Sequence, residues 1–418
     1  MPKLLKPELF ESLLPEGSTV FVQGSSSEPT ALLHLLMASP EASAGVRFVA
    51  CQIPGLNRTD FAGLHPDARF TGLFVTPEME SSYNAGKVRF MPLSYSRMYR
   101  YLSEKPVDAA LIQVAPTERR GIFSLGTSAH FVPAVLQTAK VVIAEINENL
   151  PIVGRSVQVE EARLDYVLPT AHTLPSLDPG PPSEVSRKIG SHIAELVRHG
   201  DHIQIGIGKV PSGVLDALSS HRNLVCHGGL ISDAMIDLHE VGALDPDSPL
   251  ICTSVIGTQR IYDWVRGRKE VHVLPVRDTH DVRTMAGWEC FTAINSVLAV
   301  DLHGQANAET VNGRQVGGCG GLSDFVRGAQ LSKGGRSILA LPSTAGGGTI
   351  TRIVPRLVDD IASCPRVDAD YVVTEYGIAD LAHKSLDERA EALVRIAAPS
   401  FRDALNKDRE QLAGGISR

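Results

Sequence analysis

Short β-rich runs alternate with helical patterns along the chain, and this alternation constrains the fold more than any other feature. The run at 18–24, STVFVQG, ends in a Gly-Ser-Ser-Ser loop and is followed by the helical pattern EPTALLHLLMAS. Two later runs, at 108–114 and 139–146, are almost wholly apolar, which is typical of strands covered on both faces. Regular βα alternation therefore predicts an α/β fold with mostly parallel sheets.

A proline-rich segment separates two such patterns. The segment at 174–184, LPSLDPGPPSE, holds four prolines and one glycine, a composition typical of a linker. After it, Ser183 is expected to cap a helix that ends at Gly200, and the βα pattern starts again. A chain of 418 residues is long enough for two or three domains. We therefore predict two tandem open α/β domains, at 1–178 and 183–418.

Charge and composition exclude several classes of partner. The net charge is −7, charged residues make up 21% of the chain, and no block of like charges occurs, so a nucleic-acid or anionic-membrane partner is not expected. No apolar run reaches the roughly 18 residues of a transmembrane helix, and the N-terminus lacks a signal-peptide pattern. We expect a cytoplasmic protein.

The six cysteines are scattered, without a CxxC pair or a histidine cluster at metal spacing. They are Cys51, Cys226, Cys252, Cys290, Cys319 and Cys364. In an intracellular protein the simpler interpretation of most of them is a small buried side chain. The sequence therefore predicts neither a metal site nor a tightly bound cofactor.

Three glycine-rich turns follow strands in the C-terminal part. They are GIGKVPSG at 206–213, HGG at 227–229 and VGGCGGLSDF at 316–325. Main-chain amides at such turns favour anions and oxyanions, and open α/β sheets bind ligands beyond the carboxyl ends of their strands. None of the turns matches the dinucleotide fingerprint or the phosphate loop, and neither GxSxG nor HExxH occurs in the chain.

Nine motifs together resemble one family. They are QGSSSEPTALL, APTERRGIFSLGTSAHF, VVIAEINENLP, QIGIGKVPSGVLDAL, LISDAMIDL, GGCGGLSDFVRGA, GGRSILALPSTA, TRIVPRL and YVVTEYGIADL. In this order they resemble the acetyl-CoA hydrolase/4-hydroxybutyrate CoA-transferase branch of the family I CoA-transferases. The resemblance implies two tandem α/β domains with the active site in the cleft between them. It also implies acyl-CoA and a small carboxylic acid as substrates, and a homodimer or tetramer.

The resemblance raises a chemical question at Gly229. In the family's transferases a glutamate near this turn attacks the thioester and forms an acyl-glutamyl anhydride, which is covalent catalysis by a carboxylate. Alignment on Ser232 and Asp233 places Gly229 at that position, and Leu322 stands where the family often has a glutamine. Glutamate in place of Gly229 is expected to be disfavoured if the turn needs a positive φ there.

The resemblance also indicates binding positions. The CoA arm is expected along GIGKV and GGCGG, with Gly24 and Ser25 near the thioester carbonyl. The predicted CoA- and substrate-binding residues are Gly24, Ser25, Gly206, Ile207, Gly208, Lys209, Val210, Gly228, Gly229, Leu230, Gly318, Cys319, Gly320, Gly321 and Leu322.

Four residues are candidates for the missing catalytic group. Cys319 lies in a glycine turn whose amides favour a thiolate, although a small side chain filling the turn is the simpler interpretation. His227 is closer to its turn than Cys226, and a structural histidine is as good an explanation as a general base. Glu78 and Glu80 follow a strand, where solvated acids are the commoner case. Asp60 and Glu118 are weaker candidates of the same kind, and Glu375 is interpreted as a hydrogen-bonding element of the fold.

Three functional hypotheses follow. The first is an enzyme that transfers CoA between small carboxylic acids or hydrolyses a thioester. The second is another acyl-CoA reaction on the same scaffold, such as decarboxylation, C–C cleavage or condensation, because one fold hosts several chemistries. The third is a non-catalytic CoA-binding protein.

Overall fold

The computed structural model describes residues 1–416, and the chain forms two compact units. The first unit comprises Met1–Asp178, Leu250–Thr279 and Val316–Gly320, and the second comprises Pro179–Pro249, His280–Gln315 and Gly321–Arg418. The first boundary falls inside the proline-rich segment. Because two later segments belong to the first unit, the units are not contiguous halves, and the division into domains at 1–178 and 183–418 stays a prediction.

The first unit is built on one large sheet. Its strands follow the order β1-β11-β8-β6-β2-β3-β4-β5 and pair in parallel, while β7 and β10 form an antiparallel extension of β6. The strands are β1 Lys3–Leu4, β2 Thr19–Val22, β3 Arg47–Ala50, β4 Arg69–Gly72, β5 Val88–Phe90, β6 Ala109–Pro116, β7 Ile122–Ser124, β8 Val141–Asn147, β10 Gln158–Glu160 and β11 Tyr166–Thr170. A small parallel sheet joins β15 Leu250–Cys252, β17 Val271–Val273 and β9 Arg155–Ser156, and β16 spans Ser254–Val255.

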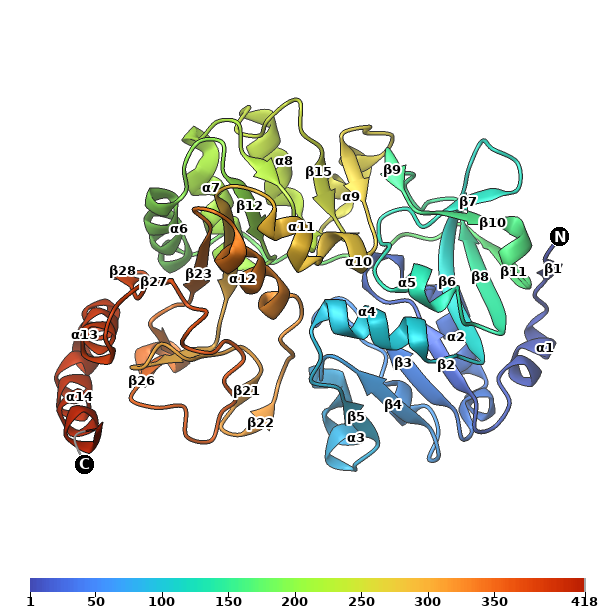
Figure 1. Ribbon diagram of the computed structural model, residues 1–418. Coiled ribbons are helices and arrows are strands. Elements are labelled where there is room, and N and C mark those ends of the chain that lie inside the picture. The colour runs from blue at the N-terminus through green and yellow to red at the C-terminus, as the bar shows by residue number, and fades with distance from the viewer. Residues whose placement is uncertain (417–418) are drawn as a thin grey trace. The chain divides into compact units, whose positions relative to one another are not determined.

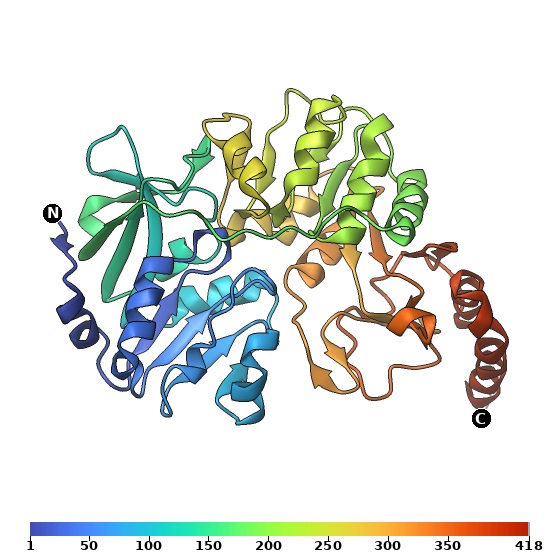
Figure 2. The same ribbon diagram turned by 180° about the vertical axis from the view of Figure 1, so that it is seen from behind.

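Helices cover both faces of the large sheet. Helix α4 lies in front of the strands in Figure 1, and α2 lies in front of them in the reverse view of Figure 2. The helices of this unit are α1 Pro7–Phe10, α2 Thr30–Ala38, α3 Glu80–Asn84, α4 Tyr95–Glu104, α5 Val132–Val135, α9 Gln259–Val265 and α10 Val276–Thr279. Coverage on both faces explains the apolar sequences of β6 and β8, whose residues Ala109–Ala115 and Val142–Glu145 are all buried.

The second unit has its own six-stranded sheet, in the order β13-β12-β18-β23-β27-β28, parallel except for the last pair. The strands are β12 His202–Ile205, β13 Val225–Cys226, β18 Phe291–Ser296, β23 Arg336–Ala340, β27 Tyr371–Thr374 and β28 Gly377–Asp380. Shorter strands lie outside this sheet: β14 Leu230–Ile231, β19 Ala299–Asp301, β20 Ala306–Asn307, β21 Thr310–Val311, β22 Arg314–Gln315, β24 Thr344–Ala345, β25 Ile350–Thr351 and β26 Ile353–Val354. The predicted α/β class with mostly parallel sheets is confirmed.

Helices also lie on both faces of the second sheet. In Figure 1, α12 is in front of the strands, and in Figure 2 the pair α6 and α7 is in front. The helices are α6 Glu184–Leu196, α7 Lys209–Ala217, α8 Asp233–Glu240, α11 Val282–Ala286, α12 Leu322–Leu331, α13 Leu386–Ile396 and α14 Arg402–Ile416. Helices α6 and α7 approach closely because Gly190 and Gly213 face each other's helix; a Cβ atom on Gly190 stands 2.1 Å from the Gly213 carbonyl oxygen.

Local signals predicted the start of α6 but not its end. Ser183 caps α6 as predicted, with its side chain accepting a hydrogen bond from the Ser186 amide. The helix ends at Leu196 rather than at Gly200, because Val197 adopts an extended backbone (φ −87°, ψ 140°). Helix α5 is a single turn, Val132–Val135. Ser232 is the N-cap of α8 but makes no side-chain capping bond.

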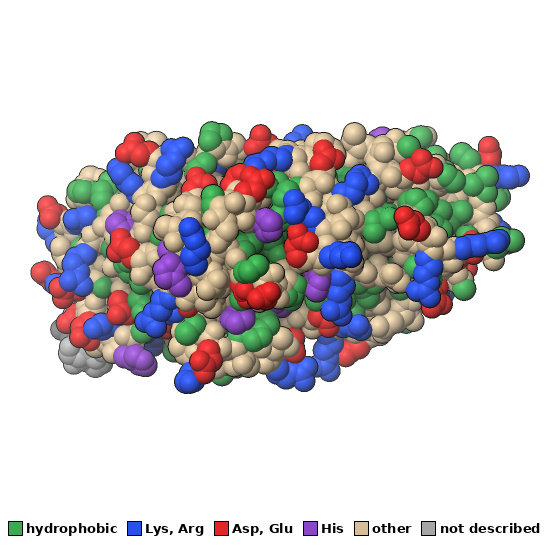
Figure 3. All heavy atoms as spheres, turned by 90° about the horizontal axis from the view of Figure 1, so that it is seen from above, with side chains coloured by type: hydrophobic (Ala, Val, Ile, Leu, Met, Phe, Trp, Pro, Cys, Tyr) green, Lys and Arg blue, Asp and Glu red, His purple; other side chains and the backbone are tan. Residues whose placement is uncertain are grey.

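The surface carries interspersed charges of both signs. On the face drawn in Figure 3, lysine and arginine side chains are interspersed with aspartate and glutamate side chains among hydrophobic and other atoms. This mixture agrees with the modest net charge of −7. None of the helices that the model describes is both long enough and apolar enough to cross a membrane.

Candidate functional site

A buried polar loop follows β2 in the first unit. Gly24 must be a glycine, because a Cβ atom there would stand 2.1 Å from the Cys51 carbonyl oxygen. Ser25 has a φ of +63°, which L residues other than glycine adopt rarely. Asn57 holds this strained turn from the other side: its Oδ1 accepts from the Ser25 amide at 2.9 Å and its Nδ2 donates to the Ser25 carbonyl at 3.0 Å. The predicted Gly24–Ser25 site is therefore a rigid, buried turn at the carboxyl edge of a parallel sheet, the usual ligand-binding edge.

The serines of this loop form a hydroxyl cluster. The Oγ atoms of Ser25 and Ser254 lie 2.5 Å apart, and the Ser26 hydroxyl donates to Thr127 at 3.0 Å. All four side chains are buried. Buried hydroxyls that bond mainly to one another are fixed in orientation, so the cluster is a preformed polar surface.

Glu28 ends this loop and was missed by the sequence reasoning. Burial raises the pKa of its carboxyl to about 7, while a hydrogen bond with Asn57 opposes the shift. A carboxyl with such a pKa exchanges its proton near neutral pH, which is a property of catalytic acids and bases. The sequence signal was the position of Glu28 directly after three serines, but burial cannot be read from that position.

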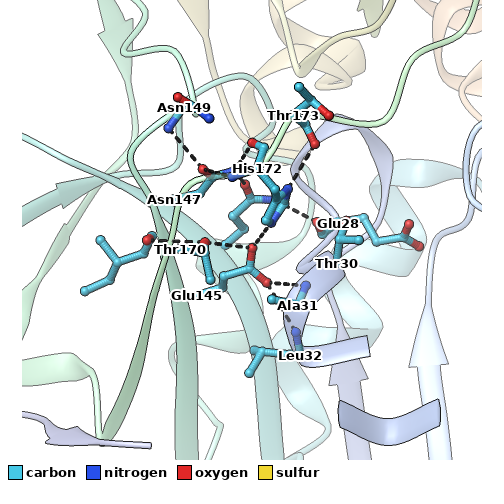
Figure 4. A network of polar contacts seen from close by, with 12 residues as sticks. Glu28, Thr30, Ala31, Leu32, Glu145, Asn147, Asn149, Thr170, His172 and Thr173 are labelled. Atoms are coloured by element: carbon cyan, nitrogen blue, oxygen red, sulfur yellow. Dashed lines mark hydrogen bonds and ion pairs between the residues drawn. The ribbon is translucent and has the colours of Figure 1, made fainter. Parts of the chain in front are cut away.

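Glu145 of β8 fixes the helix that follows the loop. Its Oε2 accepts from the amides of Ala31 and Leu32, at 2.8 and 3.3 Å, in the first turn of α2. Its Oε1 bonds to the Thr170 hydroxyl at 3.1 Å and to the His172 ring, as Figure 4 shows. A carboxylate at a helix N-terminus accepts hydrogen bonds from the first amides, which have no acceptor within the helix, and it interacts favourably with the helix dipole. The same carboxylate, through its hydrogen bond, raises the pKa of His172.

His130 is a buried neutral histidine in the first unit. Its side chain is 2% exposed, and burial lowers the pKa of the ring to about 4. Within the described part of the chain neither ring nitrogen has a hydrogen-bond partner, and the ring packs edge-on against Tyr95 and Phe131. His130 falls within the motif APTERRGIFSLGTSAHF, but sequence reasoning gave it no role.

The turn around Cys319 is shaped by close packing within the first unit. A Cβ atom on Gly318 would stand 1.9 Å from the Leu73 carbonyl oxygen, and Gly320 has a φ of +54°. The half-buried Cys319 thiol donates to the Leu93 carbonyl at a Sγ–O distance of 3.6 Å. Close packing and backbone conformation thus explain the glycines of this turn. The role of Cys319 as a nucleophile stays a prediction.

Glu78 and Glu80 lie at a different place from the serine loop, in and just after the short 3₁₀ turn Pro77–Met79 that precedes α3. Both side chains are exposed. Exposed acids in such a turn are most often solvated. Their role as a relocated carboxylate stays a prediction.

In the second unit, the turn after β12 opens helix α7. Gly208 is the N-cap of this helix, with a φ of +114° that requires glycine, and a Cβ atom there would meet nothing within 4 Å. Lys209 is exposed, while Gly206, Ile207 and Val210 are half-buried. The start of α7 therefore leaves accessible main chain where the sequence predicted CoA binding.

The turn after β13 is buried. The ring of His227 packs edge-on against Trp288 at 4.5 Å between centroids, and its side chain is 3% exposed. Burial raises the pKa of the neighbouring Cys226 thiol to about 12, so this thiol is protonated at neutral pH. Leu230 begins β14, and Leu322, the first residue of α12, packs into the hydrophobic core of this unit.

Gly229 faces a histidine that the sequence did not single out. A Cβ atom built on Gly229 would stand 3.3 Å from Nε2 of His280 and 3.7 Å from Cε2 of Phe325. A Cβ atom on Gly321 would stand 2.6 Å from the same Nε2. Gly229 does not have a positive φ, so the expectation of a backbone barrier to larger residues is wrong. A side chain at Gly229 would instead make a tight contact with the imidazole ring.

Glu375 belongs to the same carboxyl edge of the second sheet. Its carboxylate accepts from the Ser343 amide at 2.8 Å and from the Ser343 hydroxyl at 2.7 Å. It thereby ties the loop after β23 to the loop after β27. This agrees with its interpretation as a hydrogen-bonding element of the fold.

Comparison with known proteins gives two family matches along the chain. Residues 1–173 match the acetyl-CoA hydrolase/transferase N-terminal domain, and residues 257–409 match the acetyl-CoA hydrolase/transferase C-terminal domain. The chain is 34% identical to 4-hydroxybutyrate coenzyme A transferase of Clostridium kluyveri over 412 residues, which covers 96% of each protein. It is 30% identical to succinyl-CoA:cyclohexane-1-carboxylate CoA transferase of Geobacter metallireducens, covering 97% of this chain and 94% of that protein.

The fold matches a solved structure over nearly its full length. The crystal structure of RipA from Yersinia pestis superposes with a TM-score of 0.90 at 28% identity, covering 98% of both chains.

Proposed function

Since the chain belongs to the acetyl-CoA hydrolase/transferase family, we propose that it hydrolyses the thioester of a short acyl-CoA and releases free CoA. It is an enzyme that acts on acyl-CoA, by CoA transfer or by thioester hydrolysis. We propose CoA thioesters as its substrates, with small carboxylic acids as the products of hydrolysis or the acceptors of CoA transfer.

The observation that carries hydrolysis is the pairing of Gly229 with His280. By the family resemblance, position 229 is where a transferase presents its nucleophilic glutamate. A glycine cannot form an anhydride, so this position offers no covalent relay between two acids. A direct attack of water on the thioester needs no such relay, and it needs a base rather than a carboxylate nucleophile.

We propose the CoA contacts that the sequence predicted. In the second unit, the accessible main chain at Gly208 and the first turn of α7 support a role in binding the CoA arm. In the first unit, the rigid Gly24–Ser25 turn supports a role near the thioester carbonyl, because oriented donors stabilise a developing oxyanion. We also propose a homodimer or tetramer, on the family resemblance alone.

Product identity tests this function. The full chain is incubated with acetyl-CoA, propionyl-CoA and butyryl-CoA, each with and without acetate, and CoA species and intact protein are followed by mass spectrometry. Hydrolysis gives free CoA at the same rate with and without acetate, and no protein adduct. Acetyl-CoA that forms from butyryl-CoA only when acetate is present would show transfer instead. An adduct on Cys319, His227, Glu78 or Glu80 would then identify the replacement nucleophile.

The two other hypotheses are not favoured. Decarboxylation, C–C cleavage or condensation would alter the acyl chain, which the same mass spectra reveal. A CoA-binding protein without activity would bind CoA and consume none of the thioesters. Neither the similarity to named transferases nor the geometry around Gly229 supports these alternatives.

A further inference from the structure

We propose that His280 is the catalytic base of this enzyme and occupies the place that a nucleophilic side chain at position 229 would need. The inference rests on the proposed hydrolysis and names the residue that performs it. Its basis is the geometry around one imidazole ring in the second unit.

The ring is held by elements on two sides. His280 lies two residues before α11, whose N-cap Asp281 fixes the start of that helix through the Arg283 amide. The ring of Phe325, from the first turn of α12, packs against the imidazole at 4.5 Å between centroids. The side chain of His280 is 1% exposed. A ring with fixed neighbours and little contact with bulk solvent is preorganised, as a catalytic group has to be.

Two glycines face the Nε2 edge of this ring. Gly321, the N-cap of α12, has no room for a Cβ atom, which would stand 2.6 Å from Nε2 and 2.7 Å from Phe325. At Gly229 a Cβ atom would be 3.3 Å from Nε2, tighter than ordinary van der Waals contact. The ring therefore lies where two of the predicted glycine turns come together, and each turn presents main chain instead of a side chain to it.

The glycine at position 229 and the position of the His280 imidazole are linked. A side chain at 229 would press on the ring, which would have to shift by a few tenths of an ångström. His280 therefore lies next to this turn, where a family transferase has its glutamate. The reactive group is then an imidazole, which accepts a proton from water, instead of a carboxylate, which attacks as a nucleophile. Histidine is the residue most often used as a general base.

Hydrolysis begins with water activated by the imidazole. An imidazole nitrogen of His280 takes a proton from water while the water oxygen forms a bond to the thioester carbonyl carbon. The tetrahedral intermediate then breaks its C–S bond, and the CoA sulfur leaves with the proton held by the imidazolium. The products are the free carboxylic acid and CoA as the thiol, and His280 returns to its starting state. No oxidant, reductant or second substrate is consumed.

The test compares His280→Asn with a matched histidine variant in the full-length protein. Asparagine keeps a polar side chain of similar reach but cannot act as a base. The control is His202→Asn: this histidine of the same unit stacks on Trp288 at the amino end of β12, away from the carboxyl edge. Release of CoA from acetyl-CoA and butyryl-CoA gives kcat and KM, and thermal unfolding gives Tm.

We expect His280→Asn to lower kcat by roughly 100-fold or more, with KM and Tm close to those of the unsubstituted protein. The control variant, His202→Asn, should have the same kcat as the unsubstituted protein. The unsubstituted protein should show a solvent deuterium isotope effect on kcat. If His280→Asn fails to fold, His280→Gln is measured in the same way. Retention of kcat within about threefold in a folded variant, or an acyl group found on His280 itself, overturns the base assignment. Failure of the hydrolysis proposal is separate, because it appears as transfer to acetate in the unsubstituted protein.

Discussion

Nε2 of His280 lies 3.3 Å from the point where a side chain at position 229 would begin. This distance links a glycine in a turn after β13 to a histidine just before α11, two segments of the second unit that are far apart in the sequence. A side chain at Gly229, whose backbone has no positive φ, would therefore meet the imidazole ring in a tight contact. The relationship leads to several measurable consequences.

The first prediction concerns restoration of a carboxylate. Gly229→Glu alone should give little CoA exchange between butyryl-CoA and acetate, because the new Cβ atom presses against the His280 ring. The double variant Gly229→Glu with His280→Ala removes this conflict and should gain exchange, with a glutamyl adduct visible in the intact-protein mass. If the single variant exchanges CoA as fast as the double variant, the imidazole is not the barrier.

A matched control for that experiment is Gly228→Ala. A Cβ atom there meets Gln204 Cγ at 3.6 Å and the Ile205 carbonyl oxygen at 3.7 Å, which are ordinary contacts. Its Tm should stay near that of the unsubstituted protein. A large drop in Tm would mean that the whole turn, and not the ring of His280, resists side chains.

The second prediction concerns stability at Gly321. Gly321→Ala places a methyl group 2.6 Å from His280 and 2.7 Å from Phe325, and overpacking of this kind costs about 1–3 kcal/mol. Urea unfolding should detect the loss of unfolding free energy. Gly206→Ala is the control, since its Cβ atom has only Pro211 Cγ at 4.0 Å nearby. Equal stability of the two variants would contradict the packing described around His280.

The third prediction is a pH dependence of stability caused by Glu28. Its pKa is raised from 4.5 to about 7 in the folded protein, so the folded state holds a proton that the unfolded state releases. The contribution of Glu28 to the free energy of unfolding is fully present below pH 4.5 and is lost as the pH rises toward 7. At about 1.4 kcal/mol per pH unit the loss is on the order of 3 kcal/mol.

Glu28→Gln should remove this part of the pH dependence. The free energy of unfolding, measured by urea at pH 5 and pH 8, should fall less between the two values in the variant than in the unsubstituted protein. Glu16→Gln, at an exposed position, should leave the fall unchanged. An unchanged fall in Glu28→Gln would show that Glu28 is ionised in the folded protein throughout this range.

The fourth prediction concerns Glu145, which connects β8 to the start of α2. Glu145→Gln replaces a charged acceptor of two main-chain amides with a neutral one, and loss of hydrogen bonds to a charged group costs about 1.5–3 kcal/mol. Hydrogen exchange should accelerate at the amides of Ala31 and Leu32. The exposed neighbour Glu148 offers the control, Glu148→Gln, in which exchange at these amides should stay slow. Unchanged protection in Glu145→Gln would mean that α2 is held without this carboxylate.

The same contact predicts a second pH effect. Because the hydrogen bond with Glu145 raises the pKa of His172, the stabilisation from this pair is present below the ordinary histidine pKa of 6.5. It is lost as the pH rises through the elevated folded value. Titration of His172 by NMR in the unsubstituted protein and in Glu145→Gln should show a higher pKa in the former.

Sequence patterns predicted the sheets better than the site. Apolar runs identified β6 and β8, and the cap at Ser183 identified the start of α6, because these depend on neighbouring residues only. The positions of Glu28 and His280 depend on which distant segments pack together. The polar segment around His280 gave no periodic signal, and the proximity of His280 to Gly229 arises only when α11 packs against α12 and α12 packs against β18 and β23.

The central claim is that water attacks the thioester directly, without a covalent relay through the protein. A single turnover of butyryl-CoA in water labelled with heavy oxygen, with enzyme in excess, tests it most directly. The account predicts that the label enters the released butyrate in the first turnover and that the protein mass is unchanged. Label on a glutamate or aspartate of the protein, or a butyryl adduct on the protein when the first turnover is quenched before completion, would contradict it.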